Sequence, residues 1–204
     1  MQGYILKVTK VKEEDCIVDI LTHESLIKAY RFYGARHSNI TQGYKIDFEL
    51  NLSMNFLPRL RGALHLGFSW LTQREKLLFW QQFIRLLHAH LKDAEFIDEF
   101  YFELLESACL KFGKQNPKRI IIESYLQILE FEGRLHSEPI CFICDDEIKD
   151  RVSLGRAFLP AHEFCVGLDG FDLGDIGELF KSKKSTNLDD ETINSLYNIV
   201  LQGF

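Results

Sequence analysis

The sequence predicts an α+β protein in which a small β-barrel precedes a helical domain that carries a metal-binding insertion. Three observations support this fold class. Short apolar or alternating segments fill the first part of the chain, helical periodicity begins at Thr72, and cysteine and histidine pairs follow the third helical segment. We therefore expect two domains, at residues 1–70 and 71–204, with a zinc-binding stretch at residues 139–166.

Strands are expected in four segments of the first domain, residues 3–11, 16–21, 26–33 and 44–50, with a fifth at 59–68. The alternation is clearest in the fourth segment, where Tyr44, Ile46, Phe48 and Leu50 share one face. Turn signals separate the segments and no helical pattern interrupts them. Several short strands in this arrangement favour a closed OB-fold barrel.

Helices are expected from Thr72 onward, because apolar residues recur there at spacings of three and four. The main segments are residues 77–91, 93–113 and 116–133, and shorter ones follow at 175–184 and 189–201. Asp93 is expected to cap the second helix, and Asn116 with Pro117 the third. His88 and His90 are two positions apart on a helix, so we interpret them as surface or boundary residues.

Two short pairs in the second half of the chain have the spacing of a structural zinc site. Cys141 and Cys144 form a C-x-x-C pair, and His162 and Cys165 repeat the same gap after residues 145–161. A C-x-x-C pair followed, after about 15–20 residues, by a second pair is a zinc-binding pattern. Four such ligands complete a tetrahedron and leave no position for water, so the expected role of the zinc is structural.

Other interpretations of these residues stay open. A redox pair would need thiols at a helix start after a strand, whereas Pro139, Asp145 and Asp146 indicate a turn with acidic neighbours. A disulfide would need an oxidising compartment, and the N-terminus does not resemble a signal peptide. His162 can also be an ordinary surface histidine. The remaining cysteines, Cys16 and Cys109, are expected to be buried free thiols.

The composition restricts the function classes. An apolar content of 46% with 17 Phe allows a substantial core, and no apolar run is long enough to cross a membrane. We therefore expect a cytoplasmic protein. The net charge of −6 disfavours nucleic-acid binding by the molecule as a whole, because that affinity comes mainly from cations at phosphates. A local basic surface can still bind.

Such a surface is expected on the barrel, where cations and aromatic residues alternate along the strands. Cations bind phosphates and aromatic rings stack on bases, which is what a single-strand-binding surface requires. The alternative is that the strands merely expose charges to solvent and bury their aromatic residues. The candidate DNA-binding residues are Lys7, Lys10, Arg31, Arg36, Lys45, Tyr30 and Tyr33.

The chain resembles the RecO family of bacterial recombination mediators. The similar segments are the opening strand Gly3–Leu6, the acidic turn Glu13–Asp15, the second strand Ile17–Thr22 and the Gly-Ala-Arg element Gly34–Arg36. The pair Cys141 and Cys144 matches the first zinc pair of the family, and Cys165 matches its last ligand. Where many members have a second C-x-x-C, this chain has His162 and Cys165.

The resemblance implies a non-catalytic function in DNA repair. Proteins of this family bind single- and double-stranded DNA, anneal complementary strands and act with RecR to help load RecA onto DNA coated by single-strand-binding protein. They also bind the acidic, apolar C-terminal tail of single-strand-binding protein. Lys118 and Arg119 beside Ile120 and Ile121 are the expected tail site. The alternative is that both are solvated charges in the first turn of a helix.

Two other functions compete with DNA binding. A protein adaptor stabilised by zinc, without DNA contact, agrees with the negative charge. A zinc enzyme, for instance a hydrolase or a deaminase, is the second competitor. A zinc deaminase would need a glutamate two residues after a ligand histidine, and His136-Ser137-Glu138 lies too close to Cys141 to form a separate helix. The sequence contains neither a phosphate-binding G-x-x-x-x-G-K-[ST] loop nor a G-x-S-x-G elbow.

Overall fold

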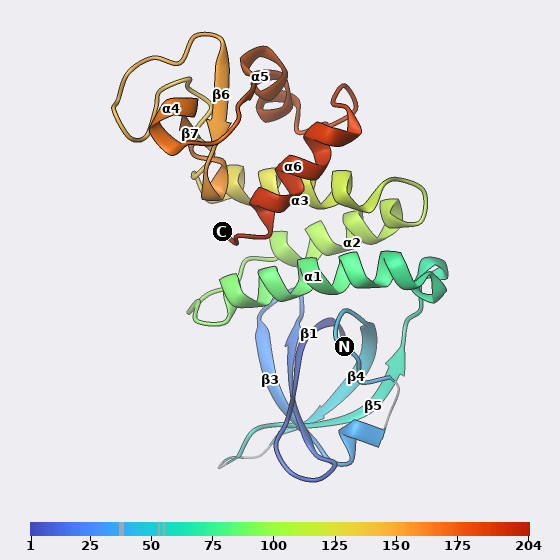
Figure 1. Cartoon of the computed structure of the whole chain (residues 1–204). Coiled ribbons are helices and arrows are strands. Elements are labelled where there is room, and N and C mark those ends of the chain that lie inside the picture. The colour runs from blue at the N-terminus through green and yellow to red at the C-terminus, as the bar shows by residue number, and fades with distance from the viewer. Residues whose placement is uncertain (37–38, 53, 55) are drawn as a thin grey trace. The chain divides into compact units, whose positions relative to one another are not determined.

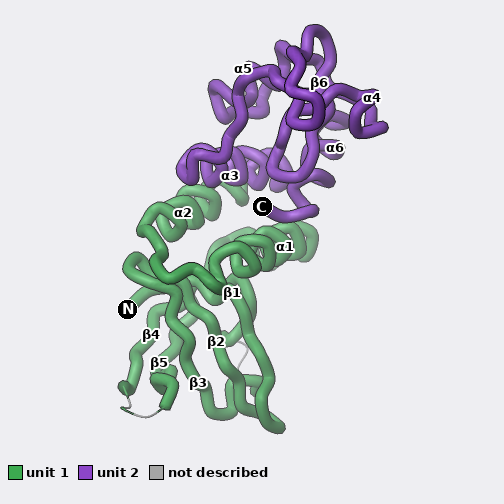
Figure 2. Tube along the Cα trace, turned by 90° about the vertical axis from the view of Figure 1, so that its left-hand side faces the viewer, with its two compact units in different colours: residues 1–114 green, residues 115–204 purple. Residues whose placement is uncertain are grey.

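The computed structural model describes residues 1–36, 39–52, 54 and 56–204. These residues form two compact units, residues 1–114 and 115–204 (Figure 2). The division lies beyond the expected boundary at residue 70, because helices α1 (Arg74–Leu91) and α2 (Phe100–Phe112) form one unit with the strands. Each helix of the described residues is too short or too polar to cross a bilayer.

The first unit contains a closed five-stranded barrel with the strand order β1–β2–β3–β5–β4 (Figure 1). All neighbours are antiparallel except β3 and β5, which pair in parallel where Tyr30 faces Arg59. This topology confirms the predicted OB-like barrel. The strands are β1 (Gln2–Lys10), β2 (Cys16–Leu21), β3 (Leu26–Arg31), β4 (Lys45–Asn51) and β5 (Arg59–His65).

The barrel core follows from alternation along the strands. On β4, Ile46 and Phe48 are buried as the pattern predicts. Gly3 allows the close approach of β1 and β2: a Cβ at this position would lie 2.5 Å from Cγ2 of Ile20 and 2.8 Å from the carbonyl oxygen of Leu21. The remaining buried core residues are Ile5, Cys16, Val18, Ile20, Ala29, Ile40 and Leu60.

Helix α1 lies across one end of the barrel (Figure 1). The indole of Trp80 is fully buried, and its Nε1 donates a hydrogen bond of 2.7 Å to the carbonyl oxygen of Gly43. Gly43 has φ +89°, a conformation that favours glycine, and a Cβ there would lie 2.8 Å from the indole ring. The barrel and α1 are therefore held together by one large buried side chain.

A buried polar pair also joins α1 to the barrel. Nε2 of His88 lies 2.7 Å from Oδ2 of Asp19 on β2, and both side chains are about nine-tenths buried. The interpretation of His88 as a surface or boundary residue was therefore wrong. Sequence spacing placed it at the edge of the apolar stripe, and the carboxylate that satisfies it lies 69 positions away in the chain.

Replacing His88 with alanine is expected to lower the free energy of unfolding of the first unit by about 1–3 kcal/mol, because Asp19 loses its buried partner. Both tryptophans of the chain, Trp70 and Trp80, lie in this unit, so their fluorescence during urea unfolding measures its stability. The exposed Arg85 on the same helix provides a control as Arg85→Ala. An equal midpoint for the two variants would contradict the structural role of the pair.

Helix α2 begins at Phe100, and the expected cap at Asp93 was wrong. Asp98 occupies the turn before the helix, and its Oδ1 accepts a hydrogen bond of 2.9 Å from the backbone N–H of Phe100. Ile97 is buried, and residues 94–98 belong to no helix. Asp98 therefore provides the side-chain cap that the sequence pattern assigned to Asp93.

The second unit begins with α3 (Pro117–Phe131), whose predicted cap is confirmed: Asn116 Oδ1 accepts a hydrogen bond of 2.9 Å from the backbone N–H of Lys118. Helix α6 (Asp190–Val200) packs against α3, and Tyr125 lies between Phe158 and Phe204. The same unit contains a small sheet with the strand order β7–β6–β8. Its strands are β6 (Arg151–Leu154), β7 (Pro160–Ala161) and β8 (Phe171–Asp172). Helix α4 (Glu163–Val166) follows β7 in the chain, and helix α5 (Leu173–Ser182) follows β8.

Candidate metal centre and nucleic-acid interface

The four predicted metal ligands come together in the second unit. Cys141 and Cys144 lie in a tight turn that closes when the N–H of Asp145 donates to the carbonyl oxygen of Cys141 at 2.9 Å. His162 directly follows β7 and precedes α4, which contains Cys165. The N–H of Phe142 donates to the carbonyl oxygen of Pro160 at 2.9 Å, so the two ligand-bearing segments are joined by the backbone.

The ligand atoms of these four residues all lie within 4.8 Å of one another. Sγ of Cys144 is 3.4 Å from Nδ1 of His162 and 3.9 Å from Sγ of Cys165. Bonds of about 2.3 Å from zinc to sulfur in a tetrahedron put two sulfurs about 3.8 Å apart. The donor set and its spacing therefore fit a tetrahedrally coordinated ion such as zinc.

The orientation of the His162 ring supports its role as a ligand. Nδ1 faces the cysteine sulfurs, and Nε2 lies 3.2 Å from the carbonyl oxygen of Glu147. An N–H at Nε2 that donates to this carbonyl leaves the lone pair of Nδ1 free for a metal, as is common for histidine ligands. The alternative of an ordinary surface histidine does not account for both contacts.

The thiols differ in their electrostatic environment. Burial raises the pKa of Cys141, but hydrogen bonds from the backbone N–H groups of His162, Ile143 and Cys144 outweigh it and bring the pKa to about 6. The pKa of Cys165 is raised to about 11 by burial and by the neighbouring thiols Cys141 and Cys144. In the metal-free site the lowered pKa of Cys141 favours its thiolate, and the raised pKa of Cys165 favours its protonated form.

Zinc affinity is expected to rise with pH between 7 and 8. The proton on Cys165 must leave when the thiolate binds zinc, and each displaced proton changes the apparent binding constant by about tenfold per pH unit. Competition with a chromophoric chelator at the two pH values measures this change. An affinity that is the same at both values would contradict binding through a thiol that is protonated at neutral pH.

A second candidate site lies on the barrel, at the seam between β3 and β5. Arg31, Phe32, Arg59 and Arg61 line a hollow of about 400 Å³. Arg59 and Arg61 alternate with the buried Leu60, so both face outward from β5. The guanidinium carbon of Arg59 lies 5.2 Å from the centroid of the Phe32 ring. Cations and an exposed aromatic ring therefore share one surface.

Arg31 contributes to this seam from β3. Its Nη1 donates a hydrogen bond of 2.9 Å to the carbonyl oxygen of Leu60, and its buried Nε has no partner among the described residues. Glu49 on β4 pairs in register with Arg61 and is exposed, so it offsets part of that charge. Arg59 is therefore the strongest single cation of the hollow. Arg59, Arg61 and Phe32 were not among the DNA-binding residues predicted from the sequence, although the Arg-x-Arg alternation is visible there.

Tyr30 and Tyr33, two of the predicted DNA-binding residues, are held by hydrogen bonds to the acidic turn Glu13–Asp15. The hydroxyl of Tyr30 donates to Asp15 at 2.6 Å and the N–H of Tyr33 donates to the same carboxylate at 2.9 Å; these bonds lower the pKa of Asp15. Tyr33 is 58% exposed. Arg36 is 66% exposed and lies over the Tyr33 ring, while its guanidinium also pairs with Glu14. The turn thus presents Tyr33 and Arg36 to solvent.

The three predicted lysines have different positions. Lys7 and Lys10 are exposed on β1 and do not line the hollow. The side chain of Lys45 is only 12% exposed, its Nζ lies 2.8 Å from Glu106 on α2, and it faces the Phe102 ring. This enclosed position does not support Lys45 as a phosphate contact, since leaving it would break the pair with Glu106. The sequence did not reveal the opposing carboxylate.

Lys118 and Arg119, the expected tail-binding pair, both have partners within the second unit. The guanidinium of Arg119 donates to the carbonyl oxygens of Ser185 and Leu188 and pairs with Asp190 at 3.0 Å. Nζ of Lys118 lies 2.5 Å from Oδ1 of Asn194. These contacts give Arg119 a structural role in holding the loop before α6. Their part in binding a partner stays a prediction.

Residues 1–71 match the family described as the RecO N-terminal domain. The matched segment contains all five strands of the barrel and ends within the 3₁₀ helix η2 (Ser69–Thr72). A search of curated proteins found no match. The family match supports the resemblance to RecO that the sequence motifs indicated.

Proposed function

We propose that this chain, whose barrel is a RecO N-terminal domain, is a non-catalytic, DNA-binding recombination mediator. It binds single- and double-stranded DNA, anneals complementary strands and, with RecR, helps load RecA onto DNA coated by single-strand-binding protein. Its place of action is the cytoplasm, at the nucleoid. The family match over residues 1–71 and the arginine-lined hollow of the barrel support this proposal.

The main support for the proposal is the group of arginines and exposed aromatic rings at the β3–β5 seam. Arg31, Arg59 and Arg61 supply cations, and Phe32 and Tyr33 are 46% and 58% exposed. Guanidinium groups bind phosphates, and each base that stacks on an aromatic ring contributes about 1–3 kcal/mol. Lys7, Lys10 and Arg36 extend the cationic surface beyond the hollow. The acidic total of the chain does not prevent binding at a face where the cations are grouped.

Zinc is assigned a structural role in the second unit. Cys141, Cys144, His162 and Cys165 would fill all four positions of a tetrahedron, so an ion held there stabilises the fold and has no open site for a substrate. The bond from His162 Nε2 to Glu147 keeps the ring oriented toward the ion. This arrangement favours a mediator with a structural metal over a zinc enzyme.

Binding of a labelled single-stranded oligonucleotide at increasing salt concentration tests the function. The zinc-containing chain is expected to bind, with an affinity that falls steeply as salt rises, and to accelerate annealing of complementary strands. Absence of binding at low salt would reject the mediator function and leave the zinc-stabilised adaptor as the better account.

The tail of single-strand-binding protein is proposed to bind the second unit beside α3, with Lys118 as the main cation. A Lys118→Ala variant is expected to bind a peptide of that tail more weakly, while Lys114→Ala, an exposed lysine ahead of α3, serves as the control. Lys118 is preferred to Arg119 because removing Arg119 also loosens the loop at residues 185–190. Unchanged tail affinity in Lys118→Ala would remove this placement.

A further inference from the structure

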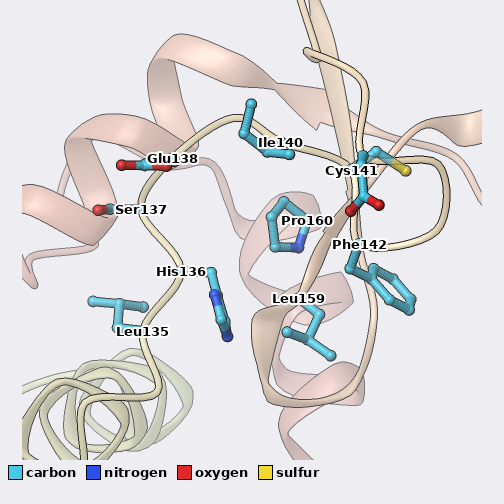
Figure 3. A pocket seen from close by; sticks show the side chains of 10 residues that line it. Leu135, His136, Ser137, Glu138, Ile140, Cys141, Phe142, Leu159 and Pro160 are labelled. Atoms are coloured by element: carbon cyan, nitrogen blue, oxygen red, sulfur yellow. The ribbon is translucent and has the colours of Figure 1, made fainter.

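The second unit contains a groove that the DNA-binding function does not use. It lies between the extended segment at residues 134–140 and the turn that carries the first metal ligands (Figure 3). The groove encloses about 500 Å³. Its apolar lining consists of Leu135, Ile140, Phe142, Leu159 and Pro160, a volume and composition suited to a large apolar side chain.

The groove contains two carboxylates beside the imidazole of His136. Glu138 and Asp145 line it, and in the described part of the chain neither lysine nor arginine does. Asp146 and Glu147, next along the turn, are exposed as well. A phosphate backbone or an acidic peptide would be repelled here, whereas a lysine or arginine beside an apolar residue would be attracted.

The backbone along the groove is available for pairing. Among the described residues, the N–H and C=O groups of His136 and Ser137 form no hydrogen bond, and this segment belongs to no helix or strand. The backbone becomes paired again at Ile140, which forms a bridge with Glu147. An extended chain segment with unpaired backbone groups can accept a strand from another protein.

The metal centre defines the far wall of the groove. Cys141 lines it, and Phe142 and Pro160, which also line it, are joined by a backbone hydrogen bond of 2.9 Å. Gly155 lies against the ring of Phe142, since a Cβ there would be 3.6 Å from that ring. The ion that fits the four ligands would therefore fix this wall without contacting the occupant.

We propose that this groove binds an extended segment of a protein partner that alternates basic and large apolar residues. The partner's backbone pairs with His136 and Ser137, one of its apolar side chains enters between Phe142, Leu159 and Leu135, and its cations face Glu138 and Asp145. The groove shares no lining residue with the arginine-lined hollow of the barrel. The groove contains carboxylates and the hollow contains arginines, so the protein partner and the DNA would be recognised by opposite charges.

Fluorescence polarisation with a short synthetic peptide that alternates lysine and leucine tests the proposal on the full zinc-containing chain. The peptide is expected to bind at physiological ionic strength, and the same peptide with glutamate in place of lysine is not. The Glu138→Lys, Asp145→Lys double variant is expected to weaken binding of the lysine peptide at least about tenfold. Methylation of alternate backbone amides of the peptide is expected to weaken binding in the same way, because it removes strand donors.

The control is Asp169→Lys, an exposed acidic residue of the same unit that does not line the groove, and it is compared with the single variant Glu138→Lys, which changes the net charge by the same amount. Asp169→Lys should keep the parent affinity if the groove, and not the general negative charge, binds the peptide. Zinc content is measured for every variant, so that loss of the fold is separated from loss of the contact. Failure of the lysine peptide to bind, equal effects of Asp169→Lys and Glu138→Lys, or displacement of the peptide by an oligonucleotide would each overturn the proposal.

Discussion

The Cys141→Ser, Cys165→Ser double variant is expected to lose its zinc and the folded structure around the metal centre. The two thiolates come from the two segments that the ion would join, and Cys141 is fully buried. Apparent binding energies of structural zinc in small zinc-finger peptides are about 10–16 kcal/mol at neutral pH, comparable to or larger than the about 5–15 kcal/mol by which a whole domain is stable. Loss of the ion should therefore unfold the structure around these four ligands and lower the solubility of the chain.

Metal analysis and thermal unfolding of the purified proteins check this prediction. The parent should contain about one zinc per chain, as four ligands at one centre require. The control is Cys109→Ala, a buried thiol of the first unit that lies far from the cluster in sequence, and it should keep the metal. A double variant that retains zinc with the parent's stability would show that these thiols do not hold it.

The Arg59→Ala, Arg61→Ala double variant is expected to weaken DNA binding about tenfold or more, and equally for unrelated base sequences. Both arginines face outward from β5 and line the same hollow as Phe32. Contacts to phosphate carry no base information, so their loss reduces affinity without changing sequence preference. Annealing of complementary strands should slow in parallel, because it depends on the same bound strands.

The control for this variant is Arg74→Ala with Arg85→Ala, which removes two exposed arginines from α1. It has the same change in net charge as the β5 variant, so a difference between the two locates the binding surface. Equal weakening in both would indicate that only the total charge matters. Neither pair is buried, so folding should be preserved in both variants.

Much of the fold could be predicted because local patterns determine it. Alternation along β4 and the turn residues between strands placed the five strands, and the spacing of Cys141, Cys144, His162 and Cys165 predicted the cluster of candidate metal ligands. Asn116 and Pro117 marked the start of α3 correctly. In each case the deciding residues are close together in sequence or follow a fixed spacing, so that no tertiary information was needed.

The errors and omissions concern residues whose partners are distant in sequence. His88 is buried because Asp19 satisfies it across 69 positions, and Lys45 is enclosed because Glu106 on α2 lies beside it. The start of α2 is capped by Asp98 and not by Asp93, because Asp98 Oδ1 accepts the hydrogen bond from the N–H of Phe100. Arg59 became a candidate only when the parallel pairing of β3 and β5 placed it beside Phe32.

The salt dependence of oligonucleotide binding tests the central claim most directly. For single strands, each phosphate contact contributes about 0.7 to the slope of log affinity against log salt concentration. The parent should show a steep slope, and loss of Arg59 and Arg61 should reduce it by about 1.4, two contacts at that value each. The control Arg74→Ala, Arg85→Ala should keep the parent slope. A slope and affinity unchanged in the Arg59→Ala, Arg61→Ala variant would contradict DNA binding at the barrel seam.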